Sequence, residues 1–469
     1  MSRRFQVKAV PSTWLESNGR RLDCGPYVSG AIEARELLRR FTTSPLKRVT
    51  TGHEGGIYNG PQFSRNYVDD SRFGVPFLTT SSLLQADLSL VSYLSRKDAE
   101  SSKLRFLGIT EGMTLITCSG TIGRMTYARK DMEGMWSNQD IMKVVPNRDC
   151  ISPGYLFAFL SSRYGLPLVL NGTYGAIIQH IEPQHISDLP VPRLVRIEDQ
   201  VHALVQQAAD HRTGASERLK RAATSIAEQL GGPILRETYS IAQIVTSSEI
   251  VRTMRMEGYY FNQRAREADV WATTHHHGFW NLGDIADVFD VPLFKHIYVE
   301  SEHGMPFFTS GELFKLDRKP EKYLSTTQTK DLDKYILGRN WVLLARSGQL
   351  GGIICRPQFS DSSLEGAATS DHVIRIVSKN EDVPPGYIYA YLSTPEIGYP
   401  LLMRTSSGTS IPALWPTYLK SIPVVRAPIP FMKMIDAEVK SAFEMRVEAT
   451  RLEDEARDLV ERTIEEGGR

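Results

Sequence analysis

Glycine-containing polar segments that occur in both halves of the chain hold the residues with the most evident binding chemistry. Residues 119–124 (SGTIGR) in the first half correspond to residues 346–352 (RSGQLGG) in the second. Glycines let a backbone approach a phosphate closely, and Arg, Ser, Thr and Gln side chains donate hydrogen bonds to its oxygens. A tight hairpin with positive φ needs the same glycines. The sequence predicts a phosphate-binding loop or a hairpin turn, and the turn accounts for the glycines in both cases.

Two further pairs of polar segments recur. Residues 136–140 (WSNQD) and 368–372 (ATSDH) precede a predicted strand in each half, and residues 171–180 and 404–410 each follow a predicted helix. Short polar side chains can read base edges, and Asn or Gln matches adenine. The same residue types suit caps and turns equally well.

Catalytic signatures are absent from the sequence. It has no GxxxxGK[ST] loop, no GxSxG elbow and no HExxH helix, and residues 120–123 precede a predicted strand, not the helix of a dinucleotide site. Carboxylates are scattered, so no acid/base pair is predicted. Residues 275–277 are three adjacent histidines, whose side chains point in different directions and favour a solvated loop over a metal site. We expect a non-catalytic protein with no catalytic or metal-ligating residues and no cofactor of its own.

Composition limits the class of protein. The 469 residues suffice for two to four domains, and 41% hydrophobic and 23% charged residues are ordinary for a folded chain. The net charge is +1, so any basic surface must be local. Four widely spaced cysteines form no CxxC pair, which fits a reducing cytoplasm. No signal peptide and no apolar stretch of about 18 residues is present, so we expect a cytoplasmic location.

The order of these segments reveals an internal repeat. Four collinear blocks recur at separations of 228 to 233 residues: 74–79 with 304–309, 115–120 with 343–348, 153–161 with 385–393, and 187–191 with 419–424. Residues 21–23 and 255–257 form a weaker pair, which suggests that the repeat includes a leading helix. Because four blocks keep their order, the chain is predicted to be a tandem duplication.

Each half ends in a long helix, predicted over 197–230 and 431–466. Small and apolar residues recur mostly at steps of three or four along both helices. A rod of about 50 Å needs a partner, so we expect the helices to pair as an antiparallel coiled coil with pseudo-two-fold symmetry. Parallel pairing, or pairing with another chain, stays open at this point. The predicted fold is α+β, with an α/β domain plus a long helix in each half. The expected segments are 1–45, 46–195, 196–235, 236–427 and 428–469.

This series of blocks resembles the specificity subunit of type I restriction-modification systems, or a related subunit of a methylation-linked phage-defence system. A Pro-Phe-Leu strand, a Ser-Gly-x-x-Gly turn, a Pro-Gly-Tyr-Leu helix start, a polar loop, a Leu-Pro strand and a long helix occur in this order. The resemblance implies two DNA target-recognition domains that read a bipartite site. It also implies two methyltransferase subunits as partners, with S-adenosylmethionine on them, and a restriction or translocase subunit that can join.

The resemblance and the loop chemistry together predict double-stranded DNA as the ligand. Phosphate contacts would come from Arg and Lys, and base contacts from Ser, Thr, Asn, Gln and His. The predicted DNA-binding residues are Arg65, Lys103, Arg105, Ser119, Thr121, Arg124, Asn138, Gln139, Gln179, His180, Lys295, Arg346, Ser347, Gln349, Ser370, His372, Arg404 and Ser407.

Two alternatives remain open at this point. An unrecognised nuclease or glycosylase is disfavoured, because the duplication preserves no matched acidic or histidine cluster. A structural adaptor of a defence complex would bind two protein copies without sequence-dependent affinity for DNA.

Overall fold

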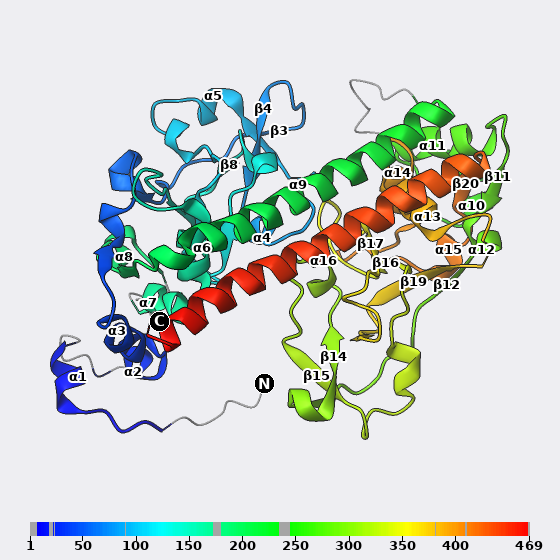
Figure 1. The fold of residues 1–469 in the computed structure, drawn as a ribbon. Coiled ribbons are helices and arrows are strands. Elements are labelled where there is room, and N and C mark those ends of the chain that lie inside the picture. Colours follow the sequence, from blue (N-terminus) through cyan, green and yellow to red (C-terminus); the bar gives the residue numbers. More distant parts are fainter. Residues whose placement is uncertain are drawn as a thin grey trace. The chain divides into compact units, whose positions relative to one another are not determined.

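The computed structural model describes residues 7–17, 22, 24–89, 91–171, 180–233, 244–379, 381–408 and 410–467 (Figure 1). The chain divides into two compact units. Unit 1 comprises Met1–Thr213 and Glu448–Arg469, and unit 2 comprises Gly214–Val447. The long helices α9 (Val195–Leu230) and α16 (Ile429–Glu465) each contribute one part to either unit.

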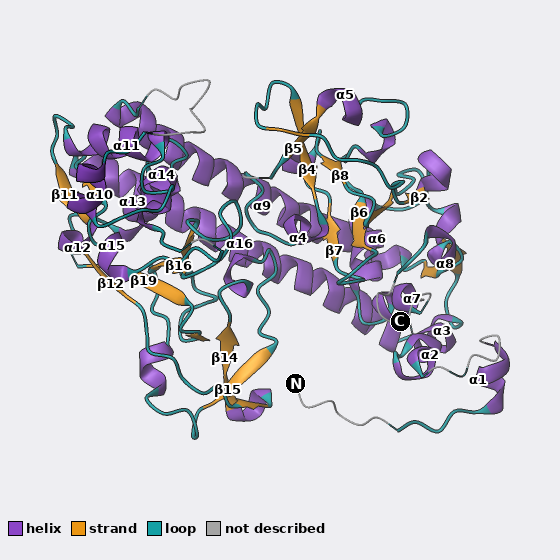
Figure 2. Ribbon diagram, turned by 180° about the vertical axis from the view of Figure 1, so that it is seen from behind, coloured by secondary structure: helices purple, strands orange, loops and turns teal. Residues whose placement is uncertain are grey.

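The described residues of unit 1 form three small sheets, whose strands are short (Figure 2). The first sheet pairs β1 with β10, the second has the order β2-β9-β6-β7, and the third has the order β3-β5-β4-β8. All pairs are antiparallel except β4 with β8, which are parallel. The strands are β1 (Thr43–Pro45), β2 (Ile57–Tyr58), β3 (Tyr67–Val68), β4 (Gly74–Leu78), β5 (Tyr93–Ser95), β6 (Thr114–Thr117), β7 (Met125–Tyr127), β8 (Trp136–Ser137), β9 (Ile141–Val144) and β10 (Pro190–Pro192).

Unit 2 repeats this topology strand for strand. Its sheets have the orders β11-β20, β12-β19-β16-β17 and β13-β15-β14-β18, and β14 is again parallel to β18. The predicted tandem duplication is therefore confirmed. The strands are β11 (Phe279–Asn281), β12 (Ala286–Phe289), β13 (Tyr298–Val299), β14 (Gly304–Phe308), β15 (Lys322–Ser325), β16 (Val342–Ala345), β17 (Pro357–Phe359), β18 (Ala368–Thr369), β19 (Val373–Ser378) and β20 (Pro423–Val425).

The shorter helices also correspond between the units, and the leading helix belongs to the repeat. The matched pairs are α3 (Ala31–Leu38) with α11 (Gln263–Thr273), α6 (Pro153–Ser161) with α13 (Pro385–Ser393), α7 (Gly165–Leu170) with α14 (Gly398–Thr405), and α8 (Pro183–Ile186) with α15 (Pro416–Leu419). The others are α1 (Ser12–Ser17), α2 (Gly25–Val28), α4 (Thr80–Leu83), α5 (Arg96–Ala99), α10 (Ser247–Thr253) and α12 (Leu282–Ile285).

The helix that begins at Pro-Gly-Tyr abuts a long helix in both units. In unit 1 the Gly154 N–H donates to His202 Nδ1 at 3.1 Å, and in unit 2 the Gly386 N–H donates to Asp436 Oδ1 at 2.8 Å. A Cβ at Gly386 would lie 2.7 Å from the Asp436 Cα, so only glycine allows this approach. The repeated Pro-Gly-Tyr motif therefore marks the place where the shorter helix packs against the long helix.

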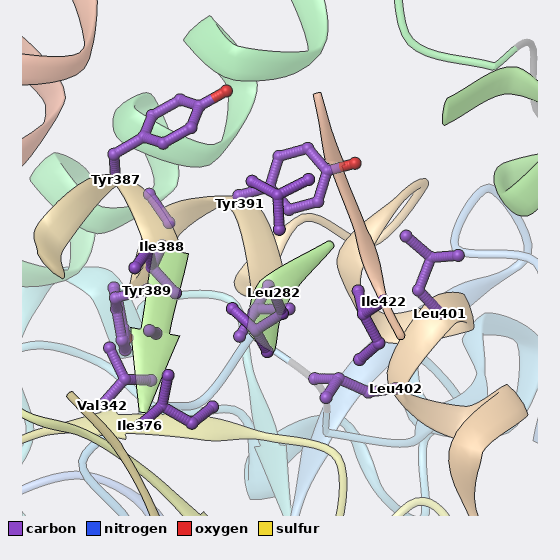
Figure 3. Close-up of a cluster of buried hydrophobic side chains, with 14 of the residues drawn as sticks. Leu282, Val342, Ile376, Tyr387, Ile388, Tyr389, Tyr391, Leu401, Leu402 and Ile422 are labelled. Carbon is purple, nitrogen blue, oxygen red and sulfur yellow. The ribbon is translucent and has the colours of Figure 1, made fainter. Parts of the chain in front are cut away.

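Each unit has its own hydrophobic core, and the long helices contribute to both. In unit 1 the core includes Val201, Val205 and Ala209 of α9 with Val460 and Ile464 of α16. The main core of unit 2 includes side chains of α12, β16, β19 and α13 (Figure 3). Side chains of both long helices complete this core.

Within each unit the early part of one long helix packs with the late part of the other. Unit 1 joins the start of α9 to the end of α16, and unit 2 joins the end of α9, at Ile226 and Leu230, to the start of α16, at Met432 and Ile435. The helices therefore run antiparallel in each unit, as predicted.

The buried stripe of α16 ends on Val460 and Ile464, because a straight α-helix has 3.6 residues per turn and its apolar face drifts from a strict heptad. Strand β4 ends at Leu78, and Thr79 caps the short helix α4 in a reciprocal bond pattern with Ser82. Within the described residues, no helix is both long and apolar enough to cross a membrane.

Candidate nucleic-acid interface

Three segments with predicted binding residues meet in unit 1. The β6–β7 turn carries Ser119, Thr121 and Arg124, and the segment after β8 leads into Asp140. The Cys118 N–H donates to the Asp140 carbonyl at 2.9 Å, and the Ile181 N–H donates to the Cys118 carbonyl at 3.0 Å. Ser119 also forms a β-bridge with His180. Thr121 and Arg124 are exposed, so this loop cluster presents them to solvent. Gln179 lies outside the described residues.

The matching segments meet in unit 2 through equivalent backbone bonds. The Arg346 N–H donates to the His372 carbonyl at 2.9 Å, and the Leu414 N–H donates to the Arg346 carbonyl at 2.7 Å. Ser347 and Ser407 both form β-bridges with Ala413. Because the two units use the same bonds, the duplication preserves the loop cluster itself and not only the sheets beneath it.

The turn glycines are explained by the hairpin. Gly120 and Gly123 have φ of +74° and +75°, which a residue with a Cβ rarely adopts. The N–H groups of Gly123 and Arg124 are bonded within the turn, to the Thr117 carbonyl at 2.8 Å and to Thr117 Oγ1 at 3.0 Å. These two donors are occupied by the fold and are not available to a phosphate.

Three predicted contacts are buried or paired within their unit. Asn138 is 3% exposed and donates to Asp140 Oδ2 at 3.1 Å, and Ser370 is 4% exposed. Arg404 forms an ion pair with Asp269 and donates to the Tyr260 hydroxyl at 3.2 Å. Burial and pairing of this kind favour a role in the fold for these side chains.

Arg346 is partly engaged by neighbouring side chains and partly exposed. Its guanidinium forms an ion pair with Asp290 at 3.4 Å and lies 4.8 Å from the ring centre of Trp415. Trp415 is 42% exposed and donates from Nε1 to Ser407 Oγ at 2.8 Å. An exposed indole beside a cation and a serine is typical of a surface that contacts bases or sugars. The sequence analysis did not single out Trp415.

The predicted cations outside these loops are dispersed. Lys103 and Arg105 are exposed on the segment between α5 and β6. Within the loop that follows β16, Gln349 is exposed. Lys295 is exposed immediately before His296. The three stacked histidines, His275 to His277, have ring centres 4.1 to 5.3 Å apart, and no metal-binding group of three or more ligands occurs among the residues that the structure describes.

A second shared feature lies at the edge of the third sheet. In unit 1 the Arg65 side chain donates to Gln139 Oε1 at 3.1 Å and lies 6.0 Å from the ring centre of Phe77. In unit 2 His296 Nε2 lies 4.0 Å from the Asp371 carboxylate. The words FSRNYV (63–68) and FKHIYV (294–299), separated by 231 residues, carry these positions. The correspondence of segments 63–68 and 294–299 can be read from the sequence. The sequence analysis did not include it, because these segments lie just ahead of the block 74–79 and its match 304–309.

Each unit also buries a cation at the same place, in β9 and β19. Lys143 and Arg375 are 0% exposed, and both donate to a carbonyl two residues earlier, Lys143 Nζ to Ile141 at 3.1 Å and Arg375 Nη1 to Val373 at 2.6 Å. Burial lowers the pKa of Lys143 to about 7 and that of Arg375 to about 10. Arg375 also reaches the Thr369 carbonyl at 3.4 Å, so it supports the loop that carries Asp371 and His372.

Comparisons with known proteins give similarity at the level of structure. No protein-family model matches the chain, and no curated protein matches it in sequence. The S subunit of a type I restriction-modification system from M. genitalium matches with 9% identity and a TM-score of 0.34, over 89% of this chain and 95% of that one. The HsdS subunit from Thermoanaerobacter tengcongensis matches with 12% identity and a TM-score of 0.28, over 91% and 96%. A chain from a structure of type I R-M complex assembly and conformational transition matches with 13% identity and a TM-score of 0.29, over 92% and 97%.

Proposed function

We propose that this chain is a non-catalytic DNA specificity subunit that reads a bipartite target. The observation that carries the proposal is the duplicated loop cluster, which both units build with equivalent backbone bonds. One polypeptide with two such surfaces suits a target with two half-sites. The exposed Arg, Thr, Gln and Trp side chains of these loops match the contacts that proteins make with phosphates and base edges.

The long helices fit the same proposal. Helix α9 has 36 residues and is therefore about 54 Å long. A helix of this length can separate two recognition domains by more than one turn of DNA, which is about 34 Å. We propose that the recognition domains span 46–195 and 236–427, and that 196–235 and 428–469 form the spacer.

The resemblance of the sequence blocks to type I specificity subunits suggests the partners. A methyltransferase would bind with two copies and supply S-adenosylmethionine and the base-flipping chemistry. The proposed DNA-contacting set keeps Arg65, Lys103, Arg105, Ser119, Thr121, Arg124, Gln139, His180, Lys295, Arg346, Ser347, Gln349, His372 and Ser407, and adds Trp415.

Mapping modified bases across the genome of the source cell tests this function. Cells with and without the chain are compared, with the methyltransferase present in both. We expect a split motif with a fixed spacer to be modified only when the chain is present. Methylation that is identical in both cell lines would contradict DNA recognition and favour a structural adaptor.

A further inference from the structure

The Phe-x-x-x-Tyr-Val segments end in β3 and β13, whose residues are the Tyr-Val of each segment. In both units they place side chains around one buried phenylalanine, and we call this arrangement the frame. In unit 1 the rings of Phe63 and Tyr67 lie 6.1 and 6.2 Å from that of Phe77, and the Arg65 guanidinium lies 6.0 Å from it. Phe77 itself is 1% exposed, whereas Tyr67 is 49% exposed. A buried ring thus supports a row of three side chains whose outer edge faces solvent.

Unit 2 keeps the buried phenylalanine and the tyrosine of this frame but changes the residue at its centre, and its Phe294 stacks on Tyr335 with ring centres 3.7 Å apart. His296 and Tyr298 have ring centres 4.9 and 5.8 Å from that of Phe307, which is fully buried. The Tyr298 hydroxyl lies 3.2 Å from His296 Nδ1, and Tyr298 is 43% exposed. The phenylalanines, the tyrosine and the valine are therefore common to both units, while Arg65 is replaced by His296.

The partner of the central residue changes with it. Gln139, which accepts from Arg65, occupies the place that Asp371 occupies beside His296. Both partners come from the loop that follows the parallel strand, β8 or β18. Positions 64 and 66, which flank Arg65, also differ between the two units. Neither joins the frame to the loop cluster, because Asn66 donates to Asp98 at 2.9 Å and Ser64 is exposed. The pair Arg65–Gln139 of unit 1 corresponds to the pair His296–Asp371 of unit 2. This pair differs between the units and connects the frame to the loop cluster.

The two pairs present different hydrogen-bonding groups. Arg65 is permanently charged and retains a planar fork of donors, which Gln139 and Phe77 hold in one orientation. Such a fork matches the O6 and N7 acceptors of guanine. Burial is the main cause that holds the pKa of His296 below its ordinary value, so its imidazole is largely neutral at pH 7. A neutral imidazole with one nitrogen facing Tyr298 and the other facing Asp371 cannot form that fork.

We propose that the pairs Arg65–Gln139 and His296–Asp371 are specificity determinants at equivalent positions of the two half-sites, and that Arg65 selects guanine where His296 does not. This inference rests on the proposed function. A position that only bound phosphate would need charge but no fixed orientation, and it would have no reason to change together with its partner.

Exchanging the pairs tests the inference by the same genome-wide mapping of modified bases. The double variant Arg65→His with Gln139→Asp should lose selection for guanine at one position of one half-motif, by at least about tenfold. The double variant His296→Arg with Asp371→Gln should gain guanine at the equivalent position of the other half. Each exchange should leave the opposite half-motif unchanged, and Lys97→Ala and Lys330→Ala, at exposed sites in units 1 and 2, serve as controls.

A conservative variant keeps the test decisive if an exchange unfolds the protein. Arg65→Lys retains the charge but lacks the planar fork, so modification should persist while selection for guanine relaxes. Full selection by Arg65→Lys, or half-motifs unchanged by the exchanges, would overturn the inference and leave the proposed function standing. A wild-type chain that directs no motif would instead contradict the function itself.

Discussion

Replacing Glu453 by alanine is expected to destabilise unit 1 by about 3–5 kcal/mol. Glu453 of α16 forms a buried ion pair with Arg212 of α9, and the two residues are 5% and 4% exposed. It also lies 3.6 Å from Arg457. Removing the carboxylate takes the opposite charge of this ion pair away from a guanidinium that is buried in the helix interface, and the cost of keeping that charge desolvated sets the size of the effect. Urea unfolding of the full chain measures it.

The matched control removes both charges. Arg212→Met together with Glu453→Met should be neutral or stabilising relative to the wild type, because a buried ion pair is often replaceable by packed apolar side chains. The exposed Arg451, which pairs with Glu448 and Glu455, provides a second control, and its replacement by alanine should leave the unfolding free energy nearly unchanged. If Glu453→Ala behaves like Arg451→Ala, the pair is not desolvated and the interpretation is wrong.

Replacing Lys143 by methionine should stabilise unit 1 at pH 7, by an amount on the order of 4 kcal/mol. The folded state holds the pKa of Lys143 at about 7 because burial penalises its charge, whereas an unperturbed lysine has a pKa of 10.5. Between these two values the unfolded chain binds a proton that the folded chain does not. Stability of the wild type therefore rises with pH across this window, and it is lowest where the lysine must be charged.

The pH dependence distinguishes this cause from a simple packing effect. The advantage of Lys143→Met should shrink as the pH rises from 7 towards 10.5, as measured by denaturant unfolding at several pH values. Arg375 in unit 2 is the matched control, since its pKa is lowered only to about 10 and it stays charged up to about pH 9. Arg375→Met should therefore show a constant difference from the wild type below that pH. A constant difference for Lys143→Met as well would contradict the assignment.

Local patterns in the sequence were sufficient for the repeated architecture. The prolines, glycines and tyrosines of the repeated blocks predicted the duplication. The glycines and prolines mark particular backbone geometries, and the tyrosines mark fixed packing positions. Gly386 is such a case, since its backbone touches Asp436 of α16. The apolar stripes located both long helices to within two residues of their ends, and antiparallel pairing was the most economical way to bury both stripes.

Residue type and spacing alone determined the duplicated α+β fold, the long helices and the general position of the polar loops. Only the tertiary structure decided which polar residues face solvent. Asn138 and Arg404 looked like DNA contacts in the sequence, but one is buried and the other is paired with Asp269. The relation of Arg65 to Gln139, 74 residues apart, arises because β3 and the loop after β8 lie at the same sheet. Burial and long-range pairing depend on how the strands are ordered in space, which spacing along the chain does not encode.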